Sequence, residues 1–242
     1  MKLLADYHMH TKYSGDCKNE LEDIIKKAVS LGLKEIAITD HGPAHNGYGI
    51  TKDHFFKLRT EIDEMQLKYP NIKILLGLEA NLLGTEGKID VDEDMRRVID
   101  WVNAGYHFGS NLPEDFKIHL YNVLSKFSKT YREKARKINT RSMVNAIKNN
   151  QINMITHPGA KGPIDVDAVA KAAAEAGTLL EINSSHGHLT VDAIKIAMKY
   201  PVKFAVCSDA HVIDRIGNVE DGLERAYIAG VEPDRLYNVI VE

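Results

Sequence analysis

Cysteine, tryptophan and long hydrophobic segments are all scarce in this 242-residue chain. Cys17 and Cys207 are its two cysteines, which is typical of a protein from a reducing compartment and provides no disulfide framework. No apolar run reaches the length of a transmembrane helix, and the N-terminal segment becomes polar too soon for a secretory signal. The formal net charge of −3 supplies no overall basic field for nucleic acid or a membrane. We therefore expect a cytoplasmic protein with no membrane partner.

Three common enzyme motifs are missing as well. No Gly-x-Gly-x-x-Gly follows the first expected strand, and there is no Walker-type phosphate loop, so nucleotide-binding folds lose support. There is also no Gly-x-Ser-x-Gly turn that would present a serine nucleophile. Histidine is abundant instead, with 11 residues against 1 Trp, and these are spread from position 8 to position 211.

Short apolar segments alternate with amphipathic ones along the whole chain. The expected strands cover 3–6, 35–39, 72–78, 97–104, 152–156, 178–182 and 202–206. The expected helices cover 20–31, 51–68, two segments within 113–149, 166–176, 191–198 and 219–229, and 81–90 is expected to be a hairpin or loop. Such alternation predicts a parallel α/β sheet, closed into a barrel near the (β/α)₈ type, with an open doubly wound sheet as the alternative. No linker interrupts it, so we expect one domain over 1–242.

Histidine and carboxylate side chains follow six of the seven expected strands. They are His8 and His10 after the first strand, His41 after the second, Glu79 at the end of the third, His107 after the fourth, His157 after the fifth, and Asp209 and His211 after the seventh. In a parallel barrel these strand ends meet at one mouth. Burying so many ionisable groups is costly unless metal ions pair with them. Imidazole and carboxylate ligands suit Zn²⁺, Mn²⁺ or Fe²⁺, and eight ligands predict two or three ions.

The motifs that contain these residues resemble, in the same order, those of the PHP (polymerase and histidinol phosphatase) family. They are His8-Met9-His10-Thr11, Ile38-Thr39-Asp40-His41-Gly42, Thr156-His157-Pro158-Gly159 and Ser208-Asp209-Ala210-His211. The resemblance covers nearly the whole chain and looks closest to stand-alone bacterial phosphatases that carry Glu79-Ala80-Asn81 and Glu181-Ile182-Asn183. It implies a distorted (β/α)7 TIM-like barrel with a trinuclear site for divalent ions, commonly zinc and sometimes manganese or iron.

The resemblance also implies a ligand set for each ion. One ion is held by His8, His10 and Asp209, and Glu79 bridges it to a second ion. That second ion is completed by His107 and His157. The third is held by His41, His211 and Asp16, a position that is histidine in some relatives. The oxygen ligand from Asp16 shifts the expected preference slightly toward Mn²⁺ or Fe²⁺.

Clustered cations suit an anionic ester, so we expect hydrolysis of a small phosphomonoester by a metal-bound hydroxide, without a covalent enzyme intermediate. Asp40 is a candidate for orienting an imidazole, and His186 and His188 are candidates for binding substrate or donating a proton. Arg215 and Lys161 are candidates for binding the phosphate. Solvated side chains are the alternative at each of these positions. His45, His54 and His119 are left out of the site because no strand end presents them.

Three other functions remain open at this stage. A PHP-type 3'-5' exonuclease or DNA-repair nuclease would use the same metals, and the segment 113–149 is locally basic, although helices usually solvate such charges. A histidinol-phosphate phosphatase is the second, although nothing in the chain selects an imidazole-bearing substrate. A degenerate metal-binding protein is the third, and the nine competent ligand positions argue against it.

Overall fold

The computed structural model describes residues 1–240, so the last two residues of the expected domain lie outside it. Seven parallel strands form one sheet in the order β2-β3-β4-β6-β7-β8-β9. These strands are β2 (Ala5–Asp6), β3 (Glu35–Ile38), β4 (Lys73–Leu83), β6 (Trp101–Gly105), β7 (Met154–Ile155), β8 (Leu179–Asn183) and β9 (Phe204–Cys207). The expected distorted seven-stranded barrel is confirmed, and the open doubly wound alternative is not.

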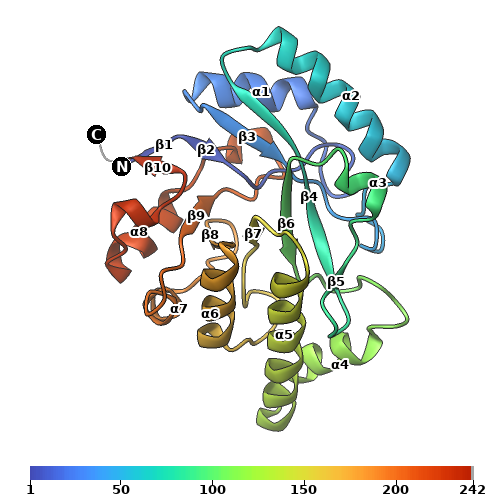
Figure 1. Cartoon of the computed structure of the whole chain (residues 1–242), viewed down its shortest axis with the longest axis vertical. Coiled ribbons are helices and arrows are strands. Elements are labelled where there is room, and N and C mark those ends of the chain that lie inside the picture. The colour runs from blue at the N-terminus through green and yellow to red at the C-terminus, as the bar shows by residue number, and fades with distance from the viewer. Residues whose placement is uncertain (241–242) are drawn as a thin grey trace.

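The barrel is nearly closed by contacts beyond the last residues of its first and last strands. Met9 forms a parallel bridge with Ala210, and the amide of His10 donates a hydrogen bond of 3.0 Å to the carbonyl of Ala210. The first predicted strand is in fact two short pieces. Its first piece, β1 (Lys2–Leu3), pairs antiparallel with β10 (Val239–Ile240), and its second is β2 of the barrel. The start and end of the described chain therefore lie side by side (Figure 1).

Helices cover the outside of the barrel, α1 and α2 over one part and α5 to α8 over another (Figure 1). They are α1 (Leu21–Ser30), α2 (Lys52–Lys68), α3 (Glu93–Arg96), α4 (Phe116–Leu124), α5 (Lys129–Asn149), α6 (Val166–Ala176), α7 (Val191–Ala197) and α8 (Glu220–Ala229), with short 3₁₀ turns η1 (Ile213–Arg215) and η2 (Pro233–Arg235). The sequence explains where they begin and end. Thr51 caps α2 by accepting a hydrogen bond from the amide of His54, and Gly177 ends α6 in the left-handed conformation that glycine tolerates.

Two differences from the predicted elements bear on the site. The third barrel strand does not end near Glu79, because β4 continues to Leu83 and turns into a hairpin with β5 (Lys88–Ile89). The strand predicted over 97–104 begins four residues later than expected: β6 covers Trp101–Gly105, and the one-turn helix α3 precedes it. Large aliphatic side chains such as Ile36, Ile38 and Leu76 fill the space between sheet and helices. No helix within residues 1–240 has the length and apolarity needed to cross a bilayer.

Candidate metal centre

The C-terminal ends of the barrel strands surround a cavity of about 300 Å³. Seven of the nine predicted metal ligands line it: Asp16, His41, Glu79, His107, His157, Asp209 and His211. The other two, His8 and His10, are completely buried beneath these groups. A larger hollow of about 520 Å³ lies at the opposite ends of the strands, around Trp101 and Tyr237, and none of the predicted site residues lines it. The convergence of distant strand ends on one mouth is therefore present.

Glu79 is the centre of the cluster. One carboxylate oxygen, Oε1, lies 3.0 Å from Nε2 of His107 and 2.9 Å from Nε2 of His157. The other, Oε2, lies 2.8 Å from Nδ1 of His41. Glu79 sits inside β4 rather than at its end, and a backbone bridge between Glu79 and His41 aligns the two chains. The longer strand thus carries this carboxylate into the middle of the mouth.

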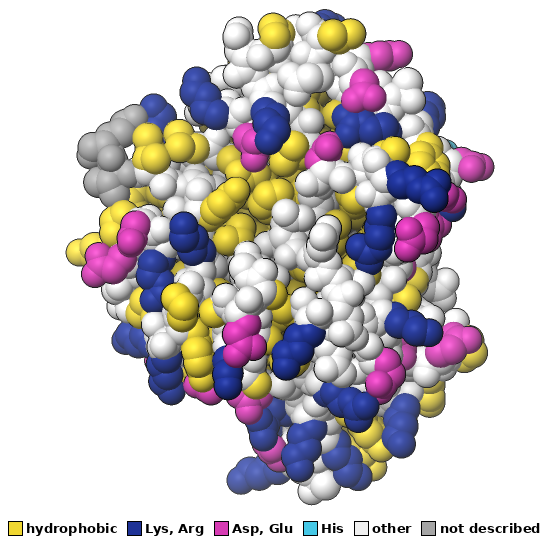
Figure 2. Space-filling view, viewed as in Figure 1, with side chains coloured by type: hydrophobic (Ala, Val, Ile, Leu, Met, Phe, Trp, Pro, Cys, Tyr) yellow, Lys and Arg dark blue, Asp and Glu magenta, His cyan; other side chains and the backbone are white. Residues whose placement is uncertain are grey.

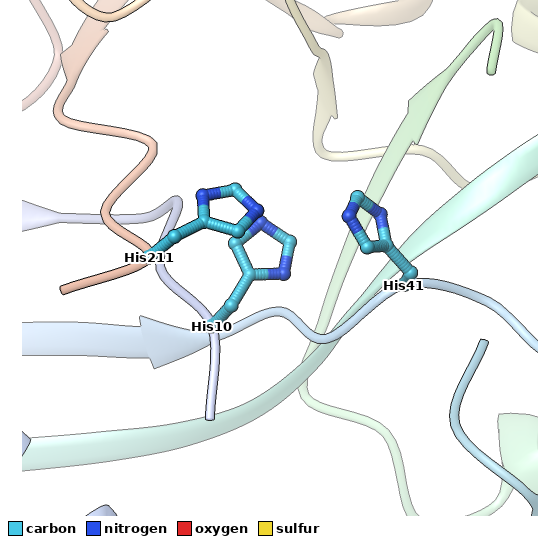
Figure 3. A group of neighbouring side chains, drawn as sticks. All are labelled: His10, His41 and His211. Atoms are coloured by element: carbon cyan, nitrogen blue, oxygen red, sulfur yellow. The ribbon is translucent and has the colours of Figure 1, made fainter. Parts of the chain in front are cut away.

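Three groups of side chains bring their ligand atoms within 4.8 Å of one another. The first is His8, His10 and Asp209, the set expected for one ion. The others are His41 with Glu79 and His107, and His10 with His41 and His211, whose rings Figure 3 shows gathered together. Asp16 lies beside the last group, with Oδ2 at 3.3 Å from Nε2 of His41. All nine predicted positions are in one cluster, but His10 and His41 each belong to two groups, which the predicted assignment did not include.

The buried ligand atoms fit divalent cations. Nε2 of His8, His10 and His107 and both carboxylate oxygens of Glu79 make no hydrogen bond of acceptable geometry among the described residues, although several of them face one another at 2.8–3.3 Å. A buried polar atom without a partner costs about 1–3 kcal/mol. Several such atoms around one centre would be a heavy penalty for a structural core, whereas a metal ion would coordinate them directly. The donor set, imidazole nitrogen plus carboxylate oxygen, is the one that Zn²⁺, Mn²⁺ and Fe²⁺ accept.

The cluster perturbs the pKa values of its own members. Burial and the neighbouring His41 together lower the pKa of His10 to about 3, which favours a neutral imidazole. Burial also acts to lower the pKa of His41, but Asp16 and Glu79 outweigh it and raise that pKa to about 10. Burial acts to raise the pKa of Glu79, but His107 and His8 hold it well below its ordinary value. The cluster thus combines groups whose pKa values are shifted in opposite directions by burial and by their charged neighbours.

Buried polar side chains outside the ligand set orient the imidazoles. Oε1 of Glu181 lies 2.8 Å from Nδ1 of His8, and Oδ1 of Asn81 lies 2.9 Å from Nδ1 of His107. Each contact leaves Nε2 of that imidazole facing the cluster, as expected for a histidine ligand whose other nitrogen is held by a partner. These roles were not predicted for Glu181 or Asn81. The period-2 pattern of a strand could have indicated Asn81, which lies on the same face of β4 as Glu79.

Asp40 was predicted to orient an imidazole, but its hydrogen bonds go to Thr11 and Ser14. Its carboxylate accepts hydrogen bonds from the amide and hydroxyl of Thr11, both at 2.7 Å, and from the hydroxyl of Ser14 at 2.8 Å. The Ser14 hydroxyl oxygen lies 3.2 Å from Nδ1 of His10 and accepts a hydrogen bond from the amide of His41. Asp40 therefore positions Ser14, and through it two predicted ligands, His10 and His41, instead of hydrogen-bonding to an imidazole itself.

The backbone carries two ligands in an uncommon conformation. His157 has φ of 29° and Asp209 has φ of 51°, in the left-handed region that non-glycine residues seldom occupy. Such residues cost about 1–3 kcal/mol each and are concentrated at functional sites. Gly105 is required nearby for a different reason, because a Cβ atom there would overlap the hydroxyl of Thr156. The close approach of β6 and β7 below His157 depends on that missing side chain.

The predicted substrate residues divide into two groups. Lys161 and His186 line the cavity, with Nζ of Lys161 3.3 Å from Nε2 of His186. His188 and Arg215 are not among the residues, within 1–240, that form its wall. Arg215 lies on the 3₁₀ turn η1, which follows His211, and this turn leads the chain away from the cavity lining. Lys161 and His186 therefore lie in the cavity wall formed by residues 1–240, and His188 and Arg215 do not.

His45, which was left out of the site on the basis of the sequence, is part of the cavity wall. Its ring lies against His41 with centroids 5.0 Å apart, and it lines the cavity although it lies in a loop after β3. The exclusion of the other two histidines agrees with the structure. His119 is buried in α4 between the hydroxyl of Tyr106 and the carbonyl of Ser110, and His54 lies in the first turn of α2. His45 was not placed at the cavity from the sequence because strand-end position was the criterion and the path of the loop was unknown.

Known proteins with similar sequences and folds agree with this description. The family description "PHP domain" matches residues 6–186. A probable phosphatase of Thermoanaerobacter sp. (strain X514) is 32% identical over 250 residues, covering 100% of this chain and 92% of that protein. A probable phosphatase of Shewanella sp. (strain ANA-3) is 30% identical over 247 residues, covering 98% and 88%.

A solved structure shares the fold at low sequence identity. The histidinol phosphate phosphatase of Lactococcus lactis subsp. lactis Il1403, crystallised with zinc, L-histidinol and phosphate, superposes with a TM-score of 0.66 at 17% identity. The match covers 96% of this chain and 95% of that one. This likeness supports the fold, whereas the family match and the sequence relatives confirm the predicted resemblance and the expectation of a phosphatase-type hydrolase. The chain belongs to the PHP domain family.

Proposed function

We propose that the chain acts as a single-domain, metal-dependent phosphatase that hydrolyses a small phosphomonoester at a site for three divalent ions. The observation that carries this proposal is the buried cluster of imidazole nitrogens and carboxylate oxygens that crowd around Glu79 without hydrogen bonds of acceptable geometry. Zn²⁺ is the first choice, with Mn²⁺ or Fe²⁺ as alternatives. Ions of this kind, when bound, supply Lewis acidity toward phosphoryl oxygens and acidify a water molecule for attack.

The protein's own groups hold these ligands and receive the phosphate. The ligand sets we propose are His8, His10 and Asp209 for one ion, His107 and His157 for a second with Glu79 between them, and His41, His211 and Asp16 for the third. Nζ of Lys161 lies 3.3 Å from Nε2 of His186, and that imidazole nitrogen lies 3.3 Å from Oδ2 of Asp209. This contact holds the ammonium group at the cavity wall, where it would attract a phosphate dianion.

Elemental analysis and a substrate panel test the proposal together. Gently purified protein should contain two or three ions per chain and should release phosphate from phosphomonoesters, with histidinol phosphate included in the panel. Labelled oxygen from water should enter the released phosphate in a single turnover. Fewer than two ions per chain, together with no hydrolysis in added Zn²⁺ or Mn²⁺, would overturn the proposal, and a phosphorylated protein intermediate would overturn direct attack by water.

A pair of lysine variants tests the phosphate contact. Lys161→Met should raise KM by roughly 2- to 5-fold with a smaller effect on kcat, since an exposed charge contact is worth up to about 1 kcal/mol. Lys171→Met, an exposed lysine on α6, is the matched control and should leave KM unchanged. Equal KM values for the two variants would remove Lys161 from the site.

A nuclease is the second candidate because of the basic α4–α5 segment. Figure 2 shows Lys and Arg side chains gathered at the lower end of the molecule, over α5. Two of these are already paired, Arg136 with Asp165 at 2.7 Å and Arg141 with Glu86 at 2.7 Å. None of the basic residues of that segment lines the cavity. Shortening of single-stranded DNA, compared with phosphate release from small esters under the same conditions, separates the two candidates.

A further inference from the structure

Exposed apolar side chains are concentrated on α4 and on the loop that precedes it. We call them the α4 face, and they are Phe108, Leu112, Phe116, Leu120, Val123 and Phe127. The three phenylalanines, in this order, are 58%, 61% and 82% exposed. Figure 2 shows hydrophobic side chains at the lower right of the molecule, over α4. Single exposed apolar residues are normal in a soluble protein, whereas a group of them marks an interaction surface.

Most of the α4 face is one stripe along a helix. Its members there are Phe116, Leu120, Val123 and Phe127. They are spaced by four, three and four residues, so their side chains lie in a row on the same side. The amide of Phe127 donates a hydrogen bond of 3.0 Å to the carbonyl of Leu124, which continues the turn beyond the last residue of α4. This spacing is typical of a helix that packs lengthwise on a second helix.

The α4 face contains no charged residue, although α4 and α5 carry many lysines and arginines. Lys117, next to Phe116, is turned toward Tyr121, with its ammonium nitrogen 5.6 Å from the ring centroid. Lys134 of α5 lies over the same ring at 5.7 Å. These ammonium groups therefore lie beside the stripe and not on it. An anionic membrane or a nucleic acid is bound through exposed basic groups, whereas an uncharged apolar stripe is typical of the interface between identical chains.

The order of side chains along the stripe suits pairing with itself. Phenylalanine stands at both ends, at positions 116 and 127, and the smaller Leu120 and Val123 lie between them. In a two-fold dimer with antiparallel helices, each residue of one copy meets its counterpart from the other end of the stripe. Phe116 would then pack on Phe127 of the second copy, and Leu120 on Val123. Large side chains meet at both ends and small ones in the middle, so the two helices can approach evenly.

The exposed area of the α4 face is sufficient for a reversible dimer. With about 200 Å² for a phenylalanine side chain, the exposed fractions of Phe108, Phe116 and Phe127 correspond to roughly 400 Å² on each copy. Pairing would cover roughly 800 Å² in total before the three aliphatic residues are added, which leads to the lower end of the range for specific interfaces. We therefore expect association in the micromolar range.

We propose that the α4 face binds a second copy of this chain, in a two-fold dimer in which α4 packs antiparallel on α4. The proposal does not depend on the proposed function, because the stripe lies outside the metal centre. Phe108 belongs both to the α4 face and to the cavity wall. The second copy would therefore lie beside the mouth of the cavity.

Sedimentation velocity of the whole chain across the micromolar range should show an equilibrium between monomer and dimer. Phe116→Lys and Phe127→Glu should each raise the dissociation constant of the dimer by roughly 30-fold or more, because each variant removes two equivalent contacts. The matched control is Leu67→Lys, since Leu67 is 85% exposed on α2 and lies outside the α4 face. It should leave the equilibrium unchanged. Circular dichroism should show all three variants folded, because the replaced side chains are exposed.

Mixing two variants tests the antiparallel arrangement. In an equal mixture of Phe116→Lys and Phe127→Glu, the introduced lysine of one copy meets the introduced glutamate of the other, and the second pair of positions keeps both phenylalanines. A dimer of the two variants should therefore form. A mixture of Phe116→Lys with Phe116→Glu provides no such pair and should stay monomeric.

Other occupants of the α4 face give different results. Added sodium chloride should not weaken the dimer, because no ion pair is broken, whereas binding to an anionic partner falls as salt is added. Wild-type protein that stays monomeric throughout the micromolar range, or a dimer that survives Phe127→Glu, would overturn the proposal. A mixture of Phe116→Lys and Phe127→Glu that stays monomeric would overturn it as well. Co-sedimentation of monomeric wild-type protein with phosphatidylglycerol vesicles would assign the face to a membrane and refute the second copy.

Discussion

Replacing Glu181 by glutamine should weaken metal binding although Glu181 is not a predicted ligand. Oε1 of Glu181 lies 2.8 Å from Nδ1 of His8, and Oε2 accepts hydrogen bonds from the amide of His157 at 2.5 Å and from Nδ2 of Asn183 at 3.0 Å. The imidazole of His8, the amide of His157 and the side-chain amide of Asn183 can all donate at once only because both carboxylate oxygens of Glu181 are acceptors. Glutamine keeps the shape but turns one of them into a donor.

Either orientation of the glutamine amide leaves a conflict. If its nitrogen faces His8, that imidazole must move its proton from Nδ1 to Nε2, and Nε2 can no longer bind a metal ion. If it faces His157 and Asn183, two buried donors lose their acceptor, at about 1–3 kcal/mol each. Loss of a partner behind a metal ligand typically lowers affinity by about 10- to 100-fold. The variant should therefore bind Zn²⁺ about 1.4–2.8 kcal/mol more weakly.

Competition with a chromophoric chelator measures the zinc affinity, and urea unfolding of metal-free protein measures the stability. The matched control is Glu175→Gln, an exposed glutamate on α6, which should change neither quantity. An affinity for Glu181→Gln equal to that of the wild type would refute the reasoning. It would mean that Glu181 is protonated in the folded protein or that it does not orient His8.

Three further predictions concern the site, the metal and the surface. His8→Ala should abolish phosphatase activity and lower the metal content, while circular dichroism shows the helices and strands retained. Removing the ions with a chelator should abolish activity and lower the thermal unfolding temperature, since ligand at about 1,000 times its Kd stabilises the folded state by about 4 kcal/mol; an unchanged unfolding temperature would argue against bound ions. On the surface, the hydrogen bond from Lys68 and a second from Tyr69 lower the pKa of Glu22 from 4.5 to about 2. This stabilisation is fully present above about pH 4.5 and is lost as the pH falls through about 2, so Glu22→Gln should be less stable than wild type at pH 7 in urea unfolding, and the difference should shrink between pH 4.5 and pH 2. A constant difference over that range would contradict it.

Local sequence patterns predicted the barrel because they depend on short-range physics. Apolar stripes at helical spacing and caps such as Thr51 and Gly177 mark helix positions directly, since each acts within a few residues of itself. The predicted strand positions were less exact. The strand β4 runs past Glu79 to Leu83 and forms a hairpin with β5, whereas the sequence indicated only a hairpin or loop over 81–90. Pairing partners far away in the chain decide where a strand stops.

The short reach of local sequence patterns also explains which residues of the site could be predicted and which could not. By itself, the sequence determined eight candidate ligands, because parallel strand ends must meet at one mouth whatever the details of the loops. The ninth, Asp16, came from the family resemblance alone. Tertiary structure decided which supporting groups reach them. Glu181 contacts His8 across 173 residues, and His45 joins the cavity only because its loop bends back toward His107. Arg215 shows the reverse, since it is close in sequence to His211 but lies outside the cavity wall formed by the described residues. Hydrogen-bond partners and loop paths depend on contacts between distant segments, which leave no periodic signal in the sequence.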